Sequence, residues 1–247
     1  MSEQKPEAPF FVGWAPAPGP IRGFLLAVSL ALIAFAGLAS YMIAATQSDP
    51  GDGAFMGRVD VAGVLQAHPY PVLHVTDSDR FDEGTALILS GGGKFGVDKE
   101  ALPLDGQLVK ARGVWLSRGD LNGLQIGRLE AVEDAATPLE NTPLGRWKLT
   151  GEICDGKCLN GAMRPGRSLA HKACANLCLL GGVPPVFVST GKVDGAEFFL
   201  LGDANNGKLG QDILDQTATM VEVEGEIMKR GELHVFNIDS STIRRVD

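Results

Sequence analysis

The chain has 247 residues, of which four are cysteine, and a formal net charge of −8 at pH 7. This length allows one large domain or two small ones. The acidic balance argues against binding to a nucleic-acid backbone or to an anionic lipid surface.

An uncharged apolar run, FLLAVSLALIAFAGLASYMIAA, occupies residues 24–45. About 20 apolar residues are enough to cross a bilayer as a helix. The run therefore predicts a transmembrane helix that follows a tail of residues 1–23. A signal peptide has a shorter apolar core nearer its start, so we expect an uncleaved anchor; the alternative is cleavage within AATQS, residues 44–48.

The basic residues around this run predict its orientation. Lys5 and Arg22 precede it, whereas the first basic residue after it is Arg58. The positive-inside tendency then places the tail in the cytoplasm and the bulk of the chain in the periplasm, as a single-pass protein of a bacterial inner membrane. Ala36 and Ser40 form a small-xxx-small pair, which allows close contact with a membrane-protein partner; an anchor with ordinary small residues is the alternative.

The remainder of the chain looks like two copies of one unit, residues 57–134 and 146–247. LVKARGVWLSRGDLNGLQI, residues 108–126, aligns without a gap on MVEVEGEIMKRGELHVFNI, residues 220–238. Each segment is typical of a strand, a tight turn containing glycine and a second strand. The earlier halves align more loosely, with Gly63 opposite Gly151.

Each copy is expected to contain about five strands, with one short helix between strands three and four. Five short strands avoid exposed edges by closing into a small barrel, and the strand pattern resembles the OB-fold. We therefore expect a mainly β protein: a transmembrane helix followed by two tandem OB-like β-barrels. Other small barrels or sandwiches are the alternative. Residues 135–145, AATPLENTPLG, are the predicted linker.

The copies differ after their first strand. The stretch from Gly151 to Pro185 is much longer than its counterpart from Gly63 to Pro71, and it holds all four cysteines. The extra residues, 152–183, are predicted to be an inserted helical module, and long loops on rigid scaffolds often carry function. Within it, Ser168 is expected to cap a helix that ends at Gly181-Gly182.

The cysteines, Cys154, Cys158, Cys174 and Cys178, follow the spacing C-x3-C-x15-C-x3-C. One interpretation is a pair of structural disulfides, since an even number of cysteines in an oxidising compartment favours them. Cross-pairing of Cys154 with Cys178 and of Cys158 with Cys174 would join the helix to the strand.

Two other interpretations use the same thiols for chemistry. Thiolates together with His171, and with Met163 as a further soft donor, suit zinc or copper. Alternatively, Cys174 lies beside His171 and Lys172, which could lower a thiol pKa and make a redox-active pair.

The module is basic within an acidic chain. Its positive residues, Lys157, Arg164, Arg167 and Lys172, predict a contact for an anion or for an acidic partner. A solvated loop is the alternative.

The stretch as a whole resembles segments of uncharacterised bacterial membrane-anchored or secreted proteins with a Cys/His-rich segment on an OB-fold-like barrel. The matching pattern is a G-x-x-x-D-x-x-C start, then H-x-x-C-A-x-x-C and a Gly-Gly-x-Pro exit. The residues that carry it are Gly151, Asp155, Cys158, His171, Cys174, Ala175, Cys178, Gly181, Gly182 and Pro184. The resemblance implies an exported, anchored protein and no particular reaction.

The sequence lacks the C-x-x-C-H haem motif, the Walker loop and the G-x-S-x-G elbow. The glycine-rich SGGGKFG, residues 90–96, is interpreted as a turn between strands. We therefore expect a non-catalytic accessory protein: a subunit or assembly factor of a membrane complex, with a structural cysteine module and no nucleic-acid partner. A metal-binding or thiol-redox protein is the alternative.

Overall fold

The computed structural model describes residues 19–46, 51–133 and 139–246. The chain divides into two compact units, residues 1–47 and 48–247. Most of the predicted cytoplasmic tail, residues 1–18, and the first part of the predicted linker, residues 135–138, lie outside the described part.

The first unit contains the predicted apolar helix, α1 (Arg22–Thr46), which follows a short 3-10 turn, η1 (Gly19–Ile21). Its 25 residues give a length of about 37 Å at the helical rise, which exceeds the roughly 30 Å of a bilayer core. Large apolar side chains, among them Phe24, Ile33 and Phe35, are exposed along it. Within the described residues, this helix is long and apolar enough to span a membrane.

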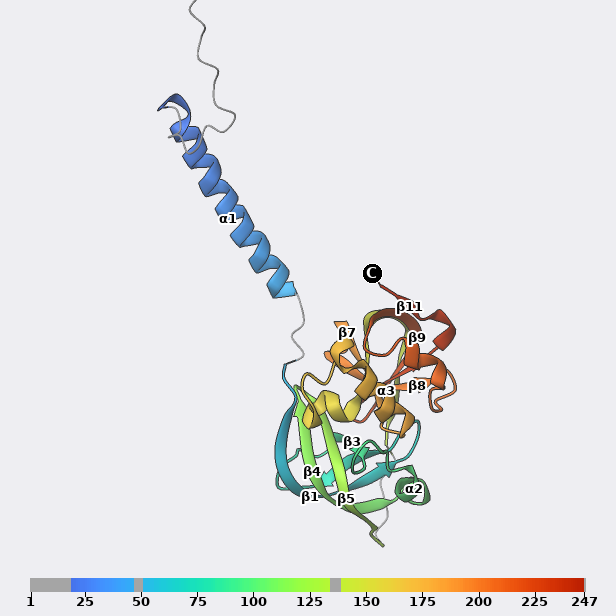
Figure 1. Ribbon diagram of the computed structural model, residues 1–247. Coiled ribbons are helices and arrows are strands. Elements are labelled where there is room, and N and C mark those ends of the chain that lie inside the picture. The colour runs from blue at the N-terminus through green and yellow to red at the C-terminus, as the bar shows by residue number, and fades with distance from the viewer. Residues whose placement is uncertain (1–18, 47–50, 134–138, 247) are drawn as a thin grey trace, which may run out of the picture. The chain divides into compact units, whose positions relative to one another are not determined.

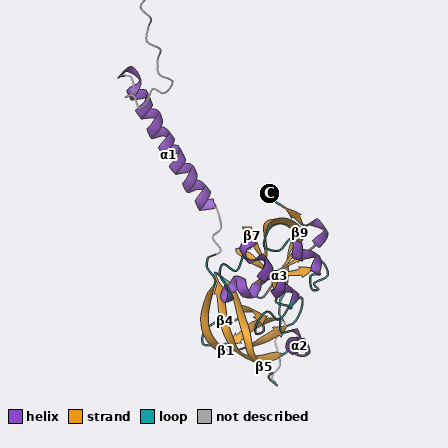
Figure 2. Cartoon of the chain, viewed as in Figure 1, coloured by secondary structure: helices purple, strands orange, loops and turns teal. Residues whose placement is uncertain are grey.

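The second unit is built mainly of strands (Figure 2). The first sheet contains β1 (Ala54–Gln66), β2 (Val72–Asp77), β3 (Ala86–Ser90), β4 (Leu108–Arg118) and β5 (Leu121–Ala131). These strands close into a barrel in the order β1-β2-β3-β5-β4, and β3 runs parallel to β5 (Figure 1). The short helices α2 (Asp98–Ala101) and η2 (Leu102–Leu104) lie between β3 and β4, as predicted.

The second sheet contains β6 (Asn141–Asp155), β7 (Pro185–Val193), β8 (Ala196–Asp203), β9 (Met220–Arg230), β10 (Leu233–Ile238) and β11 (Arg244–Arg245). Its order is β10-β8-β7-β6-β9-β11, and β10 also pairs with β9. The 3-10 turns are η5 (Gln211–Asp215), between β8 and β9 as expected, and η6 (Ser240–Thr242). Residues 141–145, assigned to the linker from sequence, form the start of β6.

The two sheets share the pairings that the alignment of the copies predicts. Gly63 pairs with Val109 in the first sheet, and Gly151 pairs with Val221 in the second. A Cβ atom on either glycine would run into a backbone carbonyl of the adjacent strand, that of His74 or of Val188. Glycine is therefore required at both positions because the strands approach too closely for a side chain.

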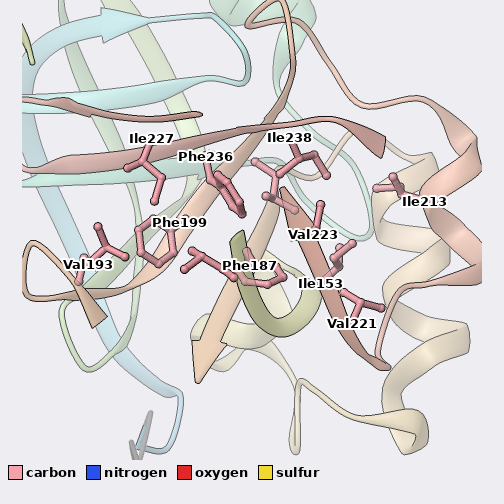
Figure 3. Packing of buried hydrophobic residues seen from close by; sticks show 13 residues of the cluster. Ile153, Phe187, Val193, Phe199, Ile213, Val221, Val223, Ile227, Phe236 and Ile238 are labelled. Atoms are coloured by element: carbon pink, nitrogen blue, oxygen red, sulfur yellow. The ribbon is translucent and has the colours of Figure 1, made fainter. Parts of the chain in front are cut away.

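Each sheet encloses its own apolar core, because alternate side chains of a strand point to one face. In the second sheet Phe187, Phe199 and Phe236 are fully buried and meet edge to face (Figure 3). Val59, Leu65, Leu87 and other apolar residues form the corresponding core of the first barrel.

A third apolar cluster joins the two sheets. Its first-sheet members are Tyr70, Val72, Ile88 and Leu121, and its second-sheet members include Val186, Leu200 and Leu233. Two arginines at aligned positions also bridge the sheets. Arg118 of β4 donates to the carbonyls of Leu159 and Pro165, and Arg230 of β9 donates to the carbonyl of His68.

Candidate metal centre

The cysteine module lies between β6 and β7, at the position that the comparison of the two copies predicts. A π-helical turn, η3 (Cys158–Ala162), follows β6, and a 3-10 turn, η4 (Leu169–His171), leads into α3 (Lys172–Leu180). The helix ends at Gly181, as expected, and Gly182 has a φ of 88°. These elements bring cysteines from the strand end and from the helix into one place.

Ser168 lies at the expected position, immediately before the 3-10 turn that leads into the helix. Its side chain makes no capping hydrogen bond, and its φ is 66°. Instead, its backbone N–H donates to the buried carboxylate of Glu152 on β6. The helix proper begins at Lys172, also without a side-chain cap. Ser168 thus stands at the start of the helical segment, where its carbonyl accepts from the N–H of His171, while its own N–H secures the loop to the sheet.

Three sulfurs and one imidazole converge in the module. Donor atoms of Cys158, His171 and Cys174 lie within 4.8 Å of one another. The Sγ atoms of Cys158 and Cys178 are 3.9 Å apart. Cys174 and Cys178 share a face of α3 because they are four residues apart. Cys158, His171 and Cys178 are buried, and Cys174 is half-buried.

Asp155, at the end of β6, organises two of these residues. Its Oδ1 accepts a hydrogen bond from the backbone N–H of Cys158 at 2.8 Å. Its Oδ2 lies 3.2 Å from Nε2 of His171. A carboxylate that accepts from Nε2 leaves the lone pair on Nδ1 for a metal, an arrangement common behind metal-bound histidines. The Asp155 carboxylate also lies within 4.8 Å of the Cys158 and Cys178 sulfurs, so it is itself a potential ligand.

One of the four cysteines expected at a metal site lies elsewhere. Cys154 belongs to the apolar cluster between the sheets, and it is absent from both donor groups found among the described residues. Burial raises the pKa of its thiol well above the usual value, and the neighbouring Glu152 acts in the same direction. Met163, the further soft donor suggested by the sequence, has 49% of its surface exposed.

The expected disulfides are not formed. All four cysteines lie in the described part of the chain, and each is a free thiol. The predicted partner of Cys154 was Cys178, but the Cys178 sulfur lies next to that of Cys158 instead. The module therefore has three clustered thiols and a separate one, not two matched pairs.

A lysine from the first sheet contacts the thiols. Nζ of Lys94 lies 2.7 Å from Sγ of Cys174 and 3.8 Å from Sγ of Cys178. The hydrogen bond to Cys174 raises the pKa of the Lys94 ammonium. The pKa of Cys178 is lowered, first by its contact with Cys158 and also by the charge of Lys94. The pKa of Cys158 is raised, first by the same contact and then by burial.

The four basic residues predicted to contact an external anion or acidic protein all bind other groups within the chain. Lys157 is buried and donates to the carbonyls of Gly91 and Gly93, at 2.6 and 2.7 Å. Lys172 donates to the carbonyls of Asp215 and Thr217. These contacts make both lysines parts of the fold.

The two arginines of the same set also contact other parts of the chain. Arg167 pairs with Glu152 at 3.4 Å. Arg164 is exposed and reaches the carbonyl of Gly53 at 3.5 Å. Of the four basic side chains, that of Arg164 is thus the most accessible to an external anion.

The sequence reasoning missed the contribution of SGGGKFG. This segment was interpreted as a turn between strands, but it connects β3 to α2 and lies against the cysteine module. Its run of glycines with a single lysine was the available signal, since glycines permit close backbone approach. Nothing local links Lys94 to cysteines about 80 residues further along the chain.

Comparisons of the chain with protein families, with curated proteins and with solved structures gave no match.

Proposed function

We propose that this chain is a membrane-anchored metal-binding protein whose Cys158, His171, Cys174 and Cys178 together hold one metal ion. The observation that carries the proposal is that donor atoms of Cys158, His171 and Cys174 lie within 4.8 Å of one another, and that the sulfur of Cys178 lies 3.9 Å from that of Cys158. The fourth cysteine is set apart. Three thiolates and one histidine form a common tetrahedral zinc site. The same soft ligands also accept Cu⁺.

The donor set favours a structural site over a catalytic one. Structural zinc has four protein ligands, whereas catalytic zinc has three and leaves a position for water or substrate. Here four side chains supply donors, three of them buried, and Asp155 lies behind the histidine. In this proposal the chain is not an enzyme, and the metal stabilises the module between the two sheets.

Two further features support a membrane-anchored protein with OB-like sheets: the strand order and the apolar helix. Both sheets follow the pairing order of an OB-like barrel, first strand to second, second to third, third to fifth and fifth to fourth. The apolar helix supports membrane anchoring, and the basic Arg22 before it supports a periplasmic site. An accessory role in a membrane complex remains a prediction from the sequence.

Metal content and thiol count test the proposal on one sample. The full-length chain would be purified in detergent without chelator, its metal measured by plasma mass spectrometry and its free thiols counted after denaturation. We expect about one equivalent of zinc or copper and four thiols. Cys178→Ala should abolish the metal, and Cys154→Ala, the matched control, should retain it.

Two results would contradict this function. A metal-free chain with a disulfide between Cys158 and Cys178 would support the redox interpretation. Equal loss of metal in Cys154→Ala and Cys178→Ala would show that the clustered set is not the ligand set.

A further inference from the structure

The glycine-rich loop that joins β3 to α2, residues 91–97, fits closely against the cysteine module. The N–H of Gly96 donates to the carbonyl of Gly181 at 2.9 Å. A Cβ on Gly181 would collide with the carbonyl of Lys94, and one on Gly96 would collide with the carbonyl of Gly182. Lys157 of the module also holds this loop, because its ammonium donates to two of the loop carbonyls. The loop belongs to the first sheet, but its backbone packs directly against that of the module in the second.

This fit places the ammonium of Lys94 at the sulfurs. It lies 2.7 Å from Sγ of Cys174, 3.8 Å from Sγ of Cys178 and 3.5 Å from the carbonyl of Cys174. An ammonium can only donate, and a neutral thiol is a weak acceptor, whereas a thiolate is a strong one. The contact is therefore suited to sulfurs that carry negative charge.

The charges of a loaded site explain why such a cation is needed. Three thiolates around a divalent ion leave one excess negative charge, and Asp155 adds another in a buried position. Uncompensated charge is costly away from water. Lys94 contacts two of the sulfurs, and the ammonium of the buried Lys157 interacts with the charges of Cys158, Cys178 and Asp155. Together they offset the excess.

On this basis, and resting on the proposed function, we infer that Lys94 is a positioning residue for the metal. Its ammonium donates to the Cys174 and Cys178 thiolates without binding the metal itself. Lys94 comes from the first sheet, whereas all the proposed ligands belong to the second. The metal is then held tightly only while the two sheets are docked. Metal loading and inter-sheet docking are coupled through this loop.

Zinc affinity of full-length variants in detergent tests the inference, measured by competition with a chromophoric chelator. Lys94→Gln keeps a hydrogen-bond donor and removes the charge. We expect it to bind zinc about 10–100-fold more weakly, the usual effect of losing an outer partner. Lys94→Arg should recover most of the affinity. Lys99→Gln removes an exposed charge from the neighbouring α2 and should leave the affinity unchanged.

Two further readouts separate positioning from general damage. The thiolate-to-cobalt charge-transfer bands of the Co²⁺-saturated chain should be as intense in Lys94→Gln as in the wild type, because the ligands are the same. Zinc should slow hydrogen exchange in residues 91–97 of the wild type, although no ligand lies there, and should not do so in Lys94→Gln. Lys94→Met provides a second neutral variant if Lys94→Gln does not fold.

The outcomes distinguish this inference from the proposed function. If the wild type holds no metal, the proposed function fails. If the wild type binds zinc tightly and both neutral variants at Lys94 bind it equally well, only the role of Lys94 is wrong. An equal loss in Lys99→Gln would also overturn it, because the effect would then be one of overall charge.

Discussion

At the scale of single residues, position on a strand decides which cysteine can reach the cluster. Ile153 points into the core of the second sheet, so its neighbour Cys154 points to the opposite face, among the apolar residues between the sheets. The chain then leaves the strand after Asp155, and the π-helical turn brings Cys158 round to the helix. Cys154 and Cys158, only four residues apart, therefore lie in different environments: the first between the sheets and the second in the thiol cluster.

Asp155→Asn tests the role assigned to the carboxylate behind His171. Asparagine keeps the shape but removes the charge that fixes the imidazole tautomer, so we expect zinc affinity to fall about 10–100-fold. Competition titration would measure it. Asp60→Asn, which removes an exposed carboxylate paired with Arg112 on the first sheet, is the control and should bind zinc like the wild type. Unchanged affinity in Asp155→Asn would argue against the proposed arrangement.

His74 provides a pH prediction that is independent of the metal. Burial and the charge of Arg230 lower its pKa from 6.5 to about 4. Between pH 6.5 and about 4, His74 is therefore protonated in the unfolded chain but neutral in the folded chain. The free energy of unfolding should be unaffected above this window and should fall as pH decreases through it, by about 3 kcal/mol in all.

His74→Val is the matched variant, because Val188 occupies the equivalent position of the second sheet. Urea unfolding of chelator-treated chains at several pH values between 4 and 7 would measure the effect. The wild type should lose more stability than the variant as pH falls, since all other groups titrate in both. Parallel pH profiles would contradict the low pKa of His74.

At the scale of elements, close approach between strands limits what each sheet tolerates. Gly113 and Gly225 occupy aligned positions in β4 and β9, and a Cβ on either would collide with a carbonyl of the adjacent strand. Gly127 in β5 is different, because a Cβ there would make an ordinary contact at 3.5 Å. The sheets therefore require glycine where the strands bend towards each other, and not throughout.

Substitution of these glycines by alanine tests this distinction. We expect Gly225→Ala to lower the free energy of unfolding by about 1–3 kcal/mol, as overpacking usually does. Gly127→Ala should have a clearly smaller effect. Denaturant unfolding would measure both. A Gly225→Ala chain as stable as the Gly127→Ala chain would show that the strands can separate to accept the methyl group.

At the scale of the whole molecule, residues 48–247 form one compact unit because the sheets share an apolar cluster. Arg118 and Arg230 reinforce it by donating to backbone carbonyls on the opposite side. The cysteine module is part of this junction, since Leu159 belongs to the shared cluster and accepts from Arg118. A metal in the module is thus placed to stabilise the junction.

We expect the two sheets to unfold in a single transition. Leu121→Ala opens a cavity in the shared cluster and should cost about 2–5 kcal/mol. Calorimetry should show the melting temperature of the whole unit decrease without splitting. Two resolved transitions, only one of them shifted, would contradict a common core.

The sequence alone determined what depends on neighbouring residues. The length of the apolar run predicted α1, the alignment of the two copies predicted the strands, and the excess length after Gly151 placed the cysteine module between β6 and β7. These features follow from short-range rules: helix rise, strand alternation and turn glycines.

The tertiary structure decided which residues form the site. The face of β6 separated Cys154 from the cluster, and the docking of the sheets brought Lys94 to Cys174. Both depend on contacts between segments far apart in the chain, which local spacing does not specify. The C-x3-C repeat suggested two equivalent pairs, whereas packing produced three clustered thiols, a histidine and a lysine from the other sheet.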